Sequence, residues 1–187
     1  LDDLVQSRKV YEHWSHAASF LPMKEYRYSL PFKKEFAKND NGWFPRDPKL
    51  MKQVLKRIRQ EGPLRSIDFK NVRQAKNSGW WDWKPAKKTL ERLFLEGQLE
   101  ISRREGFQKV YDLPERVIPS SVDKSYPTKK EYIRYLIKRT LRHHGLVTAD
   151  EVGYLQKKNI KDEIKKEFKE MLSSGEIVKL SIQAISE

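Results

Sequence analysis

The sequence predicts a mainly α-helical chain with small β-hairpin wings, built as tandem winged-helix (helix-turn-helix) units. Two observations support this fold class: three helical patterns are followed by a hairpin pattern, and the same order begins again further along the chain. Glycines that can end helices recur with the repeat, Gly62 and Gly97 in the first copy and Gly145 and Gly175 in the second. We expect four parts: an N-terminal helical and irregular connecting segment (1–47), a winged-helix unit (48–118), a linker (119–127) and a second winged-helix unit whose wing is truncated (128–187).

The first helix of the first unit is predicted to begin after Asp47. Aspartate is a good N-cap residue, and Pro48 fits the first turn, where its missing N–H leaves no hydrogen bond unmade. The helix is predicted to end at Gly62-Pro63. Its apolar face consists of Leu50, Val54, Leu55 and Ile58.

Two more helices follow in the first unit. A short one is expected from about Ser66, and a longer one from Pro85 to Gly97. The inner face of the longer helix is Ala86, Leu90, Leu93 and Phe94. The aromatic run at 80–83 (WWDW) is interpreted as a hydrophobic plug of the core, with stacking on an extruded base as the alternative.

A β-hairpin completes the first unit as its wing. Residues 99–103 alternate between apolar and polar side chains, Glu105-Gly106 can form a turn, and residues 107–113 return. In a winged helix the third helix is the recognition helix, so the helix from Pro85 takes that role here.

The second unit repeats this order. Thr128 with Glu131 and Thr148 with Glu151 have the spacing of capping boxes, and Asn159 is expected to cap the third helix. Residues 176–182 are expected to begin a strand, with too few residues left for a full wing, so we interpret the chain as an internal fragment. The residues expected to face inward are Tyr132, Ile133, Leu136, Ile137, Leu141, Val152, Leu155, Ile160, Ile164, Phe168, Met171 and Leu172.

The charge balance indicates a polyanionic partner. Lys and Arg number 39 against 26 Asp and Glu, a net charge of +13. Residues 1–123 hold 25 basic and 17 acidic side chains, and residues 124–187 hold 14 and 9, so both halves are basic. Charge alone does not separate DNA from RNA or from acidic lipid.

Two groups of side chains in the first unit are predicted to contact DNA. Those on the outer face of the recognition helix are Lys84, Lys87, Lys88 and Arg92. Those around the wing tip are Arg103, Arg104, Gln108 and Lys109. The alternative for each group is an ordinary solvated surface.

The third helix of the second unit carries a similar set of lysines, namely Lys161, Lys165, Lys166 and Lys169. They alternate with Asp162, Glu163, Glu167 and Glu170, which can pair with them at i,i+4 spacing. Such pairing would neutralise the helix, so we expect the second unit to bind more weakly.

The sequence offers no self-sufficient catalytic site, metal site or cofactor site. There is no cysteine, which excludes disulfides and thiolate metal ligands, and no glycine-rich phosphate loop. His13 and His16 are expected on one face of a helix next to Glu12, but zinc needs a third ligand and none is indicated. No apolar run approaches the roughly 20 residues that span a bilayer, and no signal peptide is visible.

Three stretches resemble the AlkZ/YcaQ family of bacterial DNA glycosylases in sequence, order and spacing. They are YEHWSHAASFLPM (11–23), GWWDWKPAK (79–87) and GFQKVYDLPER (106–116). The resemblance covers roughly residues 1–145 well and the remainder loosely.

This resemblance implies tandem winged helices within a longer protein that hydrolyses the N-glycosidic bond of alkylated purines and unhooks interstrand crosslinks. The family's catalytic pair, Gln-x-Gln or Gln-x-Asp, does not occur here; the nearest match, at 98–100 (QLE), falls on a predicted strand and is interpreted as structural. Whether the chain itself is an enzyme stays open. We therefore expect a cytoplasmic, nucleoid-associated monomer that binds duplex DNA without a cofactor or a membrane.

Two other functions remain as alternatives. A winged-helix transcription regulator would need a dimerisation helix or an effector pocket, and the sequence indicates neither. A winged-helix scaffold that binds protein would leave the basic faces without a role.

Overall fold

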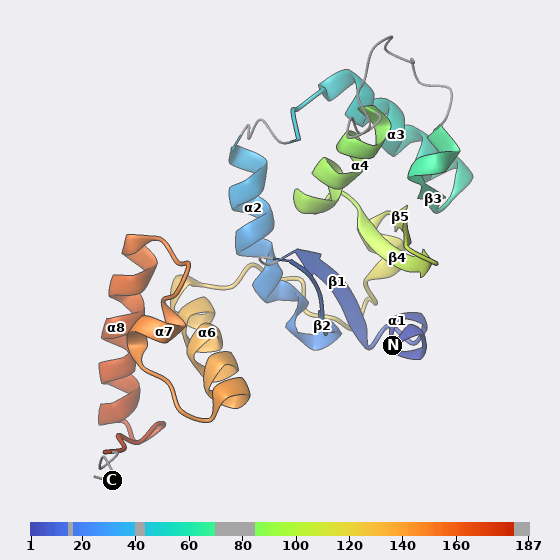
Figure 1. Cartoon of the computed structure of the whole chain (residues 1–187). Helices are drawn as coiled ribbons and strands as arrows, with labels where there is room; N and C mark the ends of the chain where they lie inside the picture. Colours follow the sequence, from blue (N-terminus) through green and yellow to red (C-terminus); the bar gives the residue numbers. More distant parts are fainter. Residues whose placement is uncertain (15–16, 40–43, 70–84, 182–187) are drawn as a thin grey trace, which may run out of the picture. The chain divides into compact units, whose positions relative to one another are not determined.

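The computed structural model describes residues 1–14, 17–39, 44–69 and 85–181, and it divides into two compact units, Leu1–Tyr126 and Pro127–Glu187. Figure 1 shows mostly helical elements with small antiparallel sheets in the first unit. The mainly α-helical class with small hairpins is thus confirmed. Within the described ranges no helix is long and apolar enough to cross a membrane.

The first unit holds two small sheets among its helices. Strands β1 and β2 form an antiparallel pair, and a second sheet has the order β3-β5-β4, with β5 in its centre. The elements in chain order are α1 (Asp2–Gln6), β1 (Val10–Trp14), β2 (Ala18–Pro22), the 3-10 helix η1 (Met23–Ser29), α2 (Leu30–Lys38), α3 (Pro48–Glu61), β3 (Leu64–Arg65), the 3-10 helix η2 (Ser66–Phe69), α4 (Pro85–Leu95), β4 (Glu100–Glu105), β5 (Gln108–Asp112) and α5 (Pro114–Val117).

Helix α3 begins and ends as its sequence predicts. The Asp47 side chain accepts a hydrogen bond from the Leu50 N–H at 3.0 Å, and Pro48 occupies the first turn. Gly62 ends the helix with φ 91°, a backbone conformation that favours glycine. The predicted order of helix, short helix, helix and hairpin is confirmed for the parts of 48–113 that the structure describes. The aromatic run at 80–83 lies outside them.

The main core of the first unit lies between α3, α4 and the three-stranded sheet. All four residues predicted for the inner face of α4 are buried. Phe32 and Phe36 of α2 pack against the same core, so the predicted connecting segment contributes to the interior of this unit. The buried residues of this core are Leu50, Met51, Val54, Ile58, Phe69, Ala86, Leu90, Leu93, Phe94, Leu95, Leu99, Ile101, Tyr111 and Leu113.

Residues 10–14 form a strand, so the prediction of a helix carrying Glu12 and His13 is wrong. Strand β1 pairs with β2 in the register Tyr11↔Leu21 and His13↔Ser19. The buried side chains of β1 contact residues from other elements. The His13 ring, for example, packs edge-on against Phe32 of α2, with 5.3 Å between the ring centroids. His16, the other histidine of the predicted helix face, lies outside the described residues.

The segment after the hairpin lies along the first unit as far as Tyr126. Val117 and Ile118 are buried against a second cluster that includes Tyr11 and Tyr26. Further along, Asp123 forms an ion pair with Arg27 at 3.2 Å. The stretch predicted as a linker thus makes specific contacts with the first unit over most of its length.

The second unit consists of α6 (Lys129–His144), α7 (Ala149–Val152) and α8 (Lys158–Ser173). Both predicted capping boxes are present, at Thr128 with Glu131 and at Thr148 with Glu151. The core contains Ile133, Leu136, Ile137, Val152, Ile164 and Met171.

Four details of the second unit differ from the predictions. Helix α8 begins one residue before Asn159, with Lys157 at the N-cap, so Asn159 does not cap it. Leu155 and Leu172 are exposed at 71% and 39%. Residues 176–181 pair with no strand among the described residues, so the expected strand is absent there. A strand needs a partner for its backbone N–H and C=O groups, and none is present in this part.

Candidate nucleic-acid interface

Helix α4 carries the first group of predicted DNA contacts, and the structure divides that group. Lys87 and Lys88 are half-buried on α4, and Lys84 lies outside the described residues. Arg92 is fully buried, with an exposed fraction of 0%. The prediction that Arg92 lies on the outer face of α4 is therefore wrong.

The guanidinium of Arg92 is instead hydrogen-bonded inside the first unit. Its Nε donates to Glu96 Oε1 at 2.7 Å, Nη1 donates to the Phe44 carbonyl at 2.6 Å, and Nη2 donates to the Asn39 carbonyl at 2.9 Å. A buried cation needs a counter-charge and hydrogen-bond acceptors, and these contacts supply one carboxylate and two carbonyls. Helical periodicity did not predict this because α2, which is distant in sequence, packs against α4.

Glu96 is the centre of this cluster. It also accepts hydrogen bonds from Arg46 Nη2 at 2.8 Å and from Gln98 Nε2 at 2.7 Å. Burial raises the pKa of Glu96, but the hydrogen bonds from Arg46, Arg92 and Gln98 outweigh it and hold that pKa below its usual value. Glu96 thus stays charged as the counter-ion of two arginines.

The three cations around the β4–β5 hairpin are each paired with a carboxylate. Arg103 contacts Glu105 at 2.6 Å, Arg104 contacts Glu12 at 2.8 Å, and Lys109 contacts Glu91 at 2.9 Å. Gln108, the fourth predicted contact, is exposed. The structure places all four residues on the hairpin, as predicted; their contact with DNA stays a prediction.

Arg104 and Lys109 belong to a buried polar cluster that joins β1, β4, β5 and α4. Glu12 and Glu91 are 2% and 8% exposed. Lys109 Nζ lies between them, 3.6 Å from Glu12 and 2.9 Å from Glu91. The Tyr111 hydroxyl donates to Glu91 at 2.8 Å, and burial, followed by the charge of Glu91, raises the pKa of Tyr111.

A second buried ion pair, between Lys33 of α2 and Glu100 of β4, was not predicted. The Tyr26 hydroxyl also donates to Glu100, at 2.7 Å, and burial is the main cause that raises the pKa of Tyr26. Gly97 makes room for this pair: it has φ 76°, and a Cβ there would lie 2.8 Å from Lys33 Cδ. Glu100 is therefore held by contacts inside the first unit, in agreement with the interpretation of residues 98–100 as structural. The sequence around Lys33 did not predict this pair, because its partner Glu100 lies 67 residues further along the chain.

In the second unit, the acidic residues of α8 pair with basic residues of α6. Glu163 contacts Lys129 at 2.7 Å, Glu170 contacts Lys130 at 2.7 Å, and Glu167 contacts Arg134 at 2.6 Å. Among the described residues no ion pair joins two residues of α8. The predicted close pairs along α8 are therefore not formed there, although the charge of Lys166 still lowers the pKa of Glu163 and Glu170.

All four lysines of α8 are exposed, namely Lys161, Lys165, Lys166 and Lys169. Lys166 lines the hollow between α6 and α8, and the other three are available to an external partner. Lys165 contacts Asp150 of α7 at 2.8 Å, an exposed pair of the kind that contributes little to stability.

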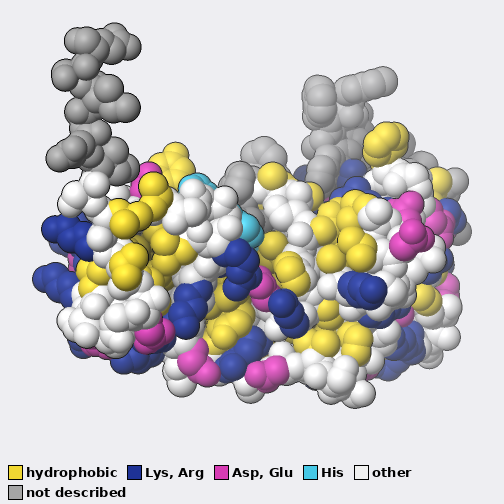
Figure 2. Space-filling model, turned by 90° about the horizontal axis from the view of Figure 1, so that it is seen from below, with side chains coloured by type: hydrophobic (Ala, Val, Ile, Leu, Met, Phe, Trp, Pro, Cys, Tyr) yellow, Lys and Arg dark blue, Asp and Glu magenta, His cyan; other side chains and the backbone are white. Residues whose placement is uncertain are grey.

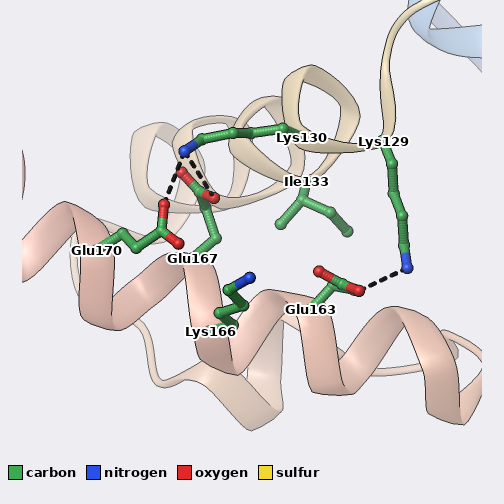
Figure 3. A pocket seen from close by; sticks show the side chains of 7 residues that line it. All are labelled: Lys129, Lys130, Ile133, Glu163, Lys166, Glu167 and Glu170. Atoms are coloured by element: carbon green, nitrogen blue, oxygen red, sulfur yellow. Dashed lines mark hydrogen bonds and ion pairs between the residues drawn. The ribbon is translucent and has the colours of Figure 1, made fainter.

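A small hollow of about 240 Å³ lies between α6 and α8. Figure 3 shows Lys129 and Lys130 reaching across it to the glutamates of α8, while Lys166 extends from α8 into the same space without a drawn interaction. Three lysines and three glutamates line it, together with Ile133, so the charges of its walls largely cancel. The hollow is thus an inter-helical ion-pair site rather than a pocket for an anion.

The basic side chains do not form one continuous patch on the face drawn in Figure 2. Dark blue Lys and Arg side chains are spread over it, with acidic side chains and apolar areas among them. The distributed excess of positive charge in the sequence is thus visible on this surface. Such a surface is compatible with several separate contacts to a polyanion.

No group of three or more His, Asp or Glu side chains within the described ranges has the arrangement of a metal site. Glu12 is engaged by Arg104, and His13 is buried beside Phe32, so neither is open to a substrate in this structure.

A comparison with protein families gives one match that spans the chain: the family described as DNA glycosylase AlkZ-like, over residues 1–186. No solved structure matches the chain.

Proposed function

Because this chain belongs to the AlkZ-like DNA glycosylase family, we propose that it is the DNA-binding portion of a repair glycosylase. That glycosylase excises alkylated purines and unhooks interstrand crosslinks by hydrolysing the N-glycosidic bond. The chain contacts duplex DNA through two winged-helix units. In the first unit α4 is the recognition helix and the β4–β5 hairpin is the wing.

The observation that carries this proposal is the arrangement of residues 48–113. A helix, a short helix, a second long helix and a hairpin follow one another, and the short strand β3 closes the sheet beside β5. That order supports a winged helix, and the net charge of +13 supports a polyanionic partner.

We further propose that α8 is the recognition helix of the second unit and that it contributes at least as much to DNA affinity as α4. On α4, Arg92 is buried and donates hydrogen bonds to groups inside the first unit. On α8 the lysines are exposed, because the glutamates that alternate with them are held by α6. Each lysine that reaches a phosphate adds counterion release to the binding free energy.

We propose that these 187 residues do not themselves supply the hydrolytic step. Hydrolysis of the glycosidic bond needs a group that orients and activates water. The family's Gln-x-Gln or Gln-x-Asp pair does not occur in the 187 residues, and the buried carboxylates Glu12, Glu91 and Glu100 are engaged with cations.

The test is the salt dependence of duplex binding, measured by fluorescence anisotropy with two unrelated DNA sequences. With roughly 4 to 8 phosphate contacts, the slope of log affinity against log salt should be about −4 to −7. Equal affinity for both sequences is expected of a repair protein, whereas a strong preference for one would favour the transcription regulator. No binding, or binding indifferent to salt, would remove the proposal and favour the protein-binding scaffold.

A further inference from the structure

The tip of the β4–β5 hairpin presents an aromatic ring to solvent. Phe107 is 99% exposed, more than any other large apolar side chain in the described part of the chain. Leaving a phenylalanine in water forgoes the stabilisation that its burial would provide. Single exposed apolar residues are common. A role for this ring must therefore be argued from its position and from the contacts that hold the hairpin.

The ring stands at the outermost point of a tight turn. Glu105 pairs with Gln108 across the two strands, which leaves Gly106 and Phe107 as the two-residue connection. Gly106 has φ 59°, a backbone conformation that glycine adopts without strain. No packed neighbour determines the identity of residue 107, because its side chain lies almost wholly in water.

The base beneath the ring is rigidly held. Arg104 Nη1 lies 3.5 Å from the Phe107 carbonyl, while its other nitrogens donate to the buried Glu12 at 2.9 and 2.8 Å. On the neighbouring strand, Lys109 is fixed to Glu91. The backbone at the tip is therefore connected, through one arginine, to a carboxylate inside the first unit. A rigid support lowers the entropy that an inserting side chain loses on binding.

The cations on either side of the ring are all engaged in ion pairs within the chain. Arg103 and Arg65 both contact Glu105, at 2.6 and 2.8 Å, and Arg104 contacts Glu12 at 2.8 Å. These arginines and Lys109 are paired within the chain, so the tip offers DNA an apolar ring on a charge-compensated base. This is the arrangement of a wedge rather than of a phosphate clamp.

We propose that Phe107 inserts between adjacent base pairs of the bound duplex as an apolar wedge. This inference rests on the proposed DNA-binding function, and it names the part of the DNA that the hairpin contacts: the base stack. The inserted ring gains stacking with the bases, while the DNA loses the stacking of one step. The net gain is greatest where that step is already weakened, as at an abasic site, because less stacking is lost.

The test uses the 187-residue chain and a duplex that carries 2-aminopurine beside an abasic site. Fluorescence of the probe rises when its base is unstacked, and anisotropy of a separate label gives the affinity. Wild type should raise the 2-aminopurine signal, and Phe107→Ala should not. The same substitution should lower affinity for the abasic duplex about tenfold, and for an intact duplex about threefold or less, because there the stacking gained by the ring is largely offset by the unstacking of the bases.

Two variants serve as controls. Phe107→Leu keeps an apolar wedge and should retain most of the signal. Tyr154→Ala removes another aromatic side chain, 73% exposed and in the second unit, and should leave the 2-aminopurine signal of the bound duplex as in wild type. Neither Phe107 nor Tyr154 is packed, so all the variants should fold.

The outcomes separate this proposal from the proposed function. Absence of duplex binding by wild type would overturn both. Duplex binding that Phe107→Ala leaves unchanged, in affinity and in 2-aminopurine signal, would overturn the wedge alone and favour a protein contact at the tip. An equal loss of the 2-aminopurine signal from Tyr154→Ala, with the duplex bound, would also overturn it, because the unstacking would then not belong to the hairpin.

Discussion

Glu12 and Arg104 form a two-point ion pair across 92 residues of sequence: Arg104 Nε donates to Glu12 Oε2 at 2.9 Å and Nη2 donates to Oε1 at 2.8 Å. Glu12 lies on β1 and Arg104 on β4, so this pair ties the N-terminal hairpin to the predicted wing. The two parallel hydrogen bonds fix orientation as well as distance. Through them the first 47 residues support the element that is proposed to enter DNA.

Glu12→Gln should destabilise the first unit by about 1–3 kcal/mol, because it removes the counter-ion of Arg104 and leaves a buried polar contact incomplete. Urea denaturation followed by tryptophan fluorescence would measure this. Glu105→Gln is the matched control: Glu105 also contacts two arginines, but its side chain is 38% exposed, and the expected cost is about 1 kcal/mol or less. Equal costs for the two substitutions would show that the burial of Glu12 contributes nothing.

Arg92→Ala should cost about 1–3 kcal/mol of stability, because it removes one of the three donors to Glu96 and the donor to each of two carbonyls. Arg103→Ala removes an arginine whose side chain is 48% exposed, and it should cost about 1 kcal/mol or less. Thermal unfolding of both variants gives the comparison. If Arg92→Ala folds normally and only weakens DNA binding, the buried network does not have the role described and Arg92 belongs to the interface after all.

Local patterns in the sequence predicted the helices well. The N-caps at Asp47, Thr128 and Thr148 act through side chains within three residues of the helix start, so the signal and its structure lie in the same short segment. Gly62 likewise ends α3 through its own backbone conformation. These features do not depend on the rest of the fold.

The candidate site was predicted less well, because its charges are paired over long distances. Arg92 is held by Asn39, more than 50 residues away, and Arg104 is held by Glu12, more than 90 residues away. The periodicity of a single helix or strand does not contain that information. The same holds for α8: its glutamates have basic neighbours at i,i+4, but α6 supplies closer partners. Strand β3 was missed because two residues are too short for a recognisable alternation.

The two helices proposed to bind DNA can be ranked by paired substitutions. Lys161→Ala with Lys169→Ala should weaken duplex binding at least as much as Lys87→Ala with Lys88→Ala, since these α8 lysines are exposed and the α4 lysines are half-buried. Each lost phosphate contact should reduce the salt slope by about 0.9, so up to about 1.8 for each pair. Anisotropy titrations at three salt concentrations provide both values. A larger loss of affinity from the α4 pair would show that the first unit makes the main contact with DNA.

Acid should weaken the first unit partly through Glu96. The hydrogen bonds from Arg46, Arg92 and Gln98 hold its pKa below the usual value, so its folded pKa lies below its unfolded pKa. The stability that this carboxylate provides is therefore complete above the unfolded value of about 4.3 and is lost as pH falls through the folded value. The free energy of unfolding should fall more steeply below about pH 5 in wild type than in Glu96→Gln. Gln98→Ala, which removes one donor and keeps the carboxylate, should lie between them; parallel curves would contradict this account.

The chain alone should not release 7-methylguanine from DNA. Hydrolysis needs a positioned group to activate water and stabilisation of the positive charge that develops on the sugar. The nearest candidates in the first unit are Glu12 and His13, and the structure holds Glu12 against Arg104 and buries His13 beside Phe32. The measurement is incubation with DNA that contains 7-methylguanine, followed by alkaline cleavage of abasic sites, with buffer and heat-killed protein as controls for spontaneous loss of the base. Cleavage clearly above both controls, and abolished by Glu12→Gln under conditions in which that variant is folded, would mean that these residues contain a catalytic site and that DNA binding is not their whole function.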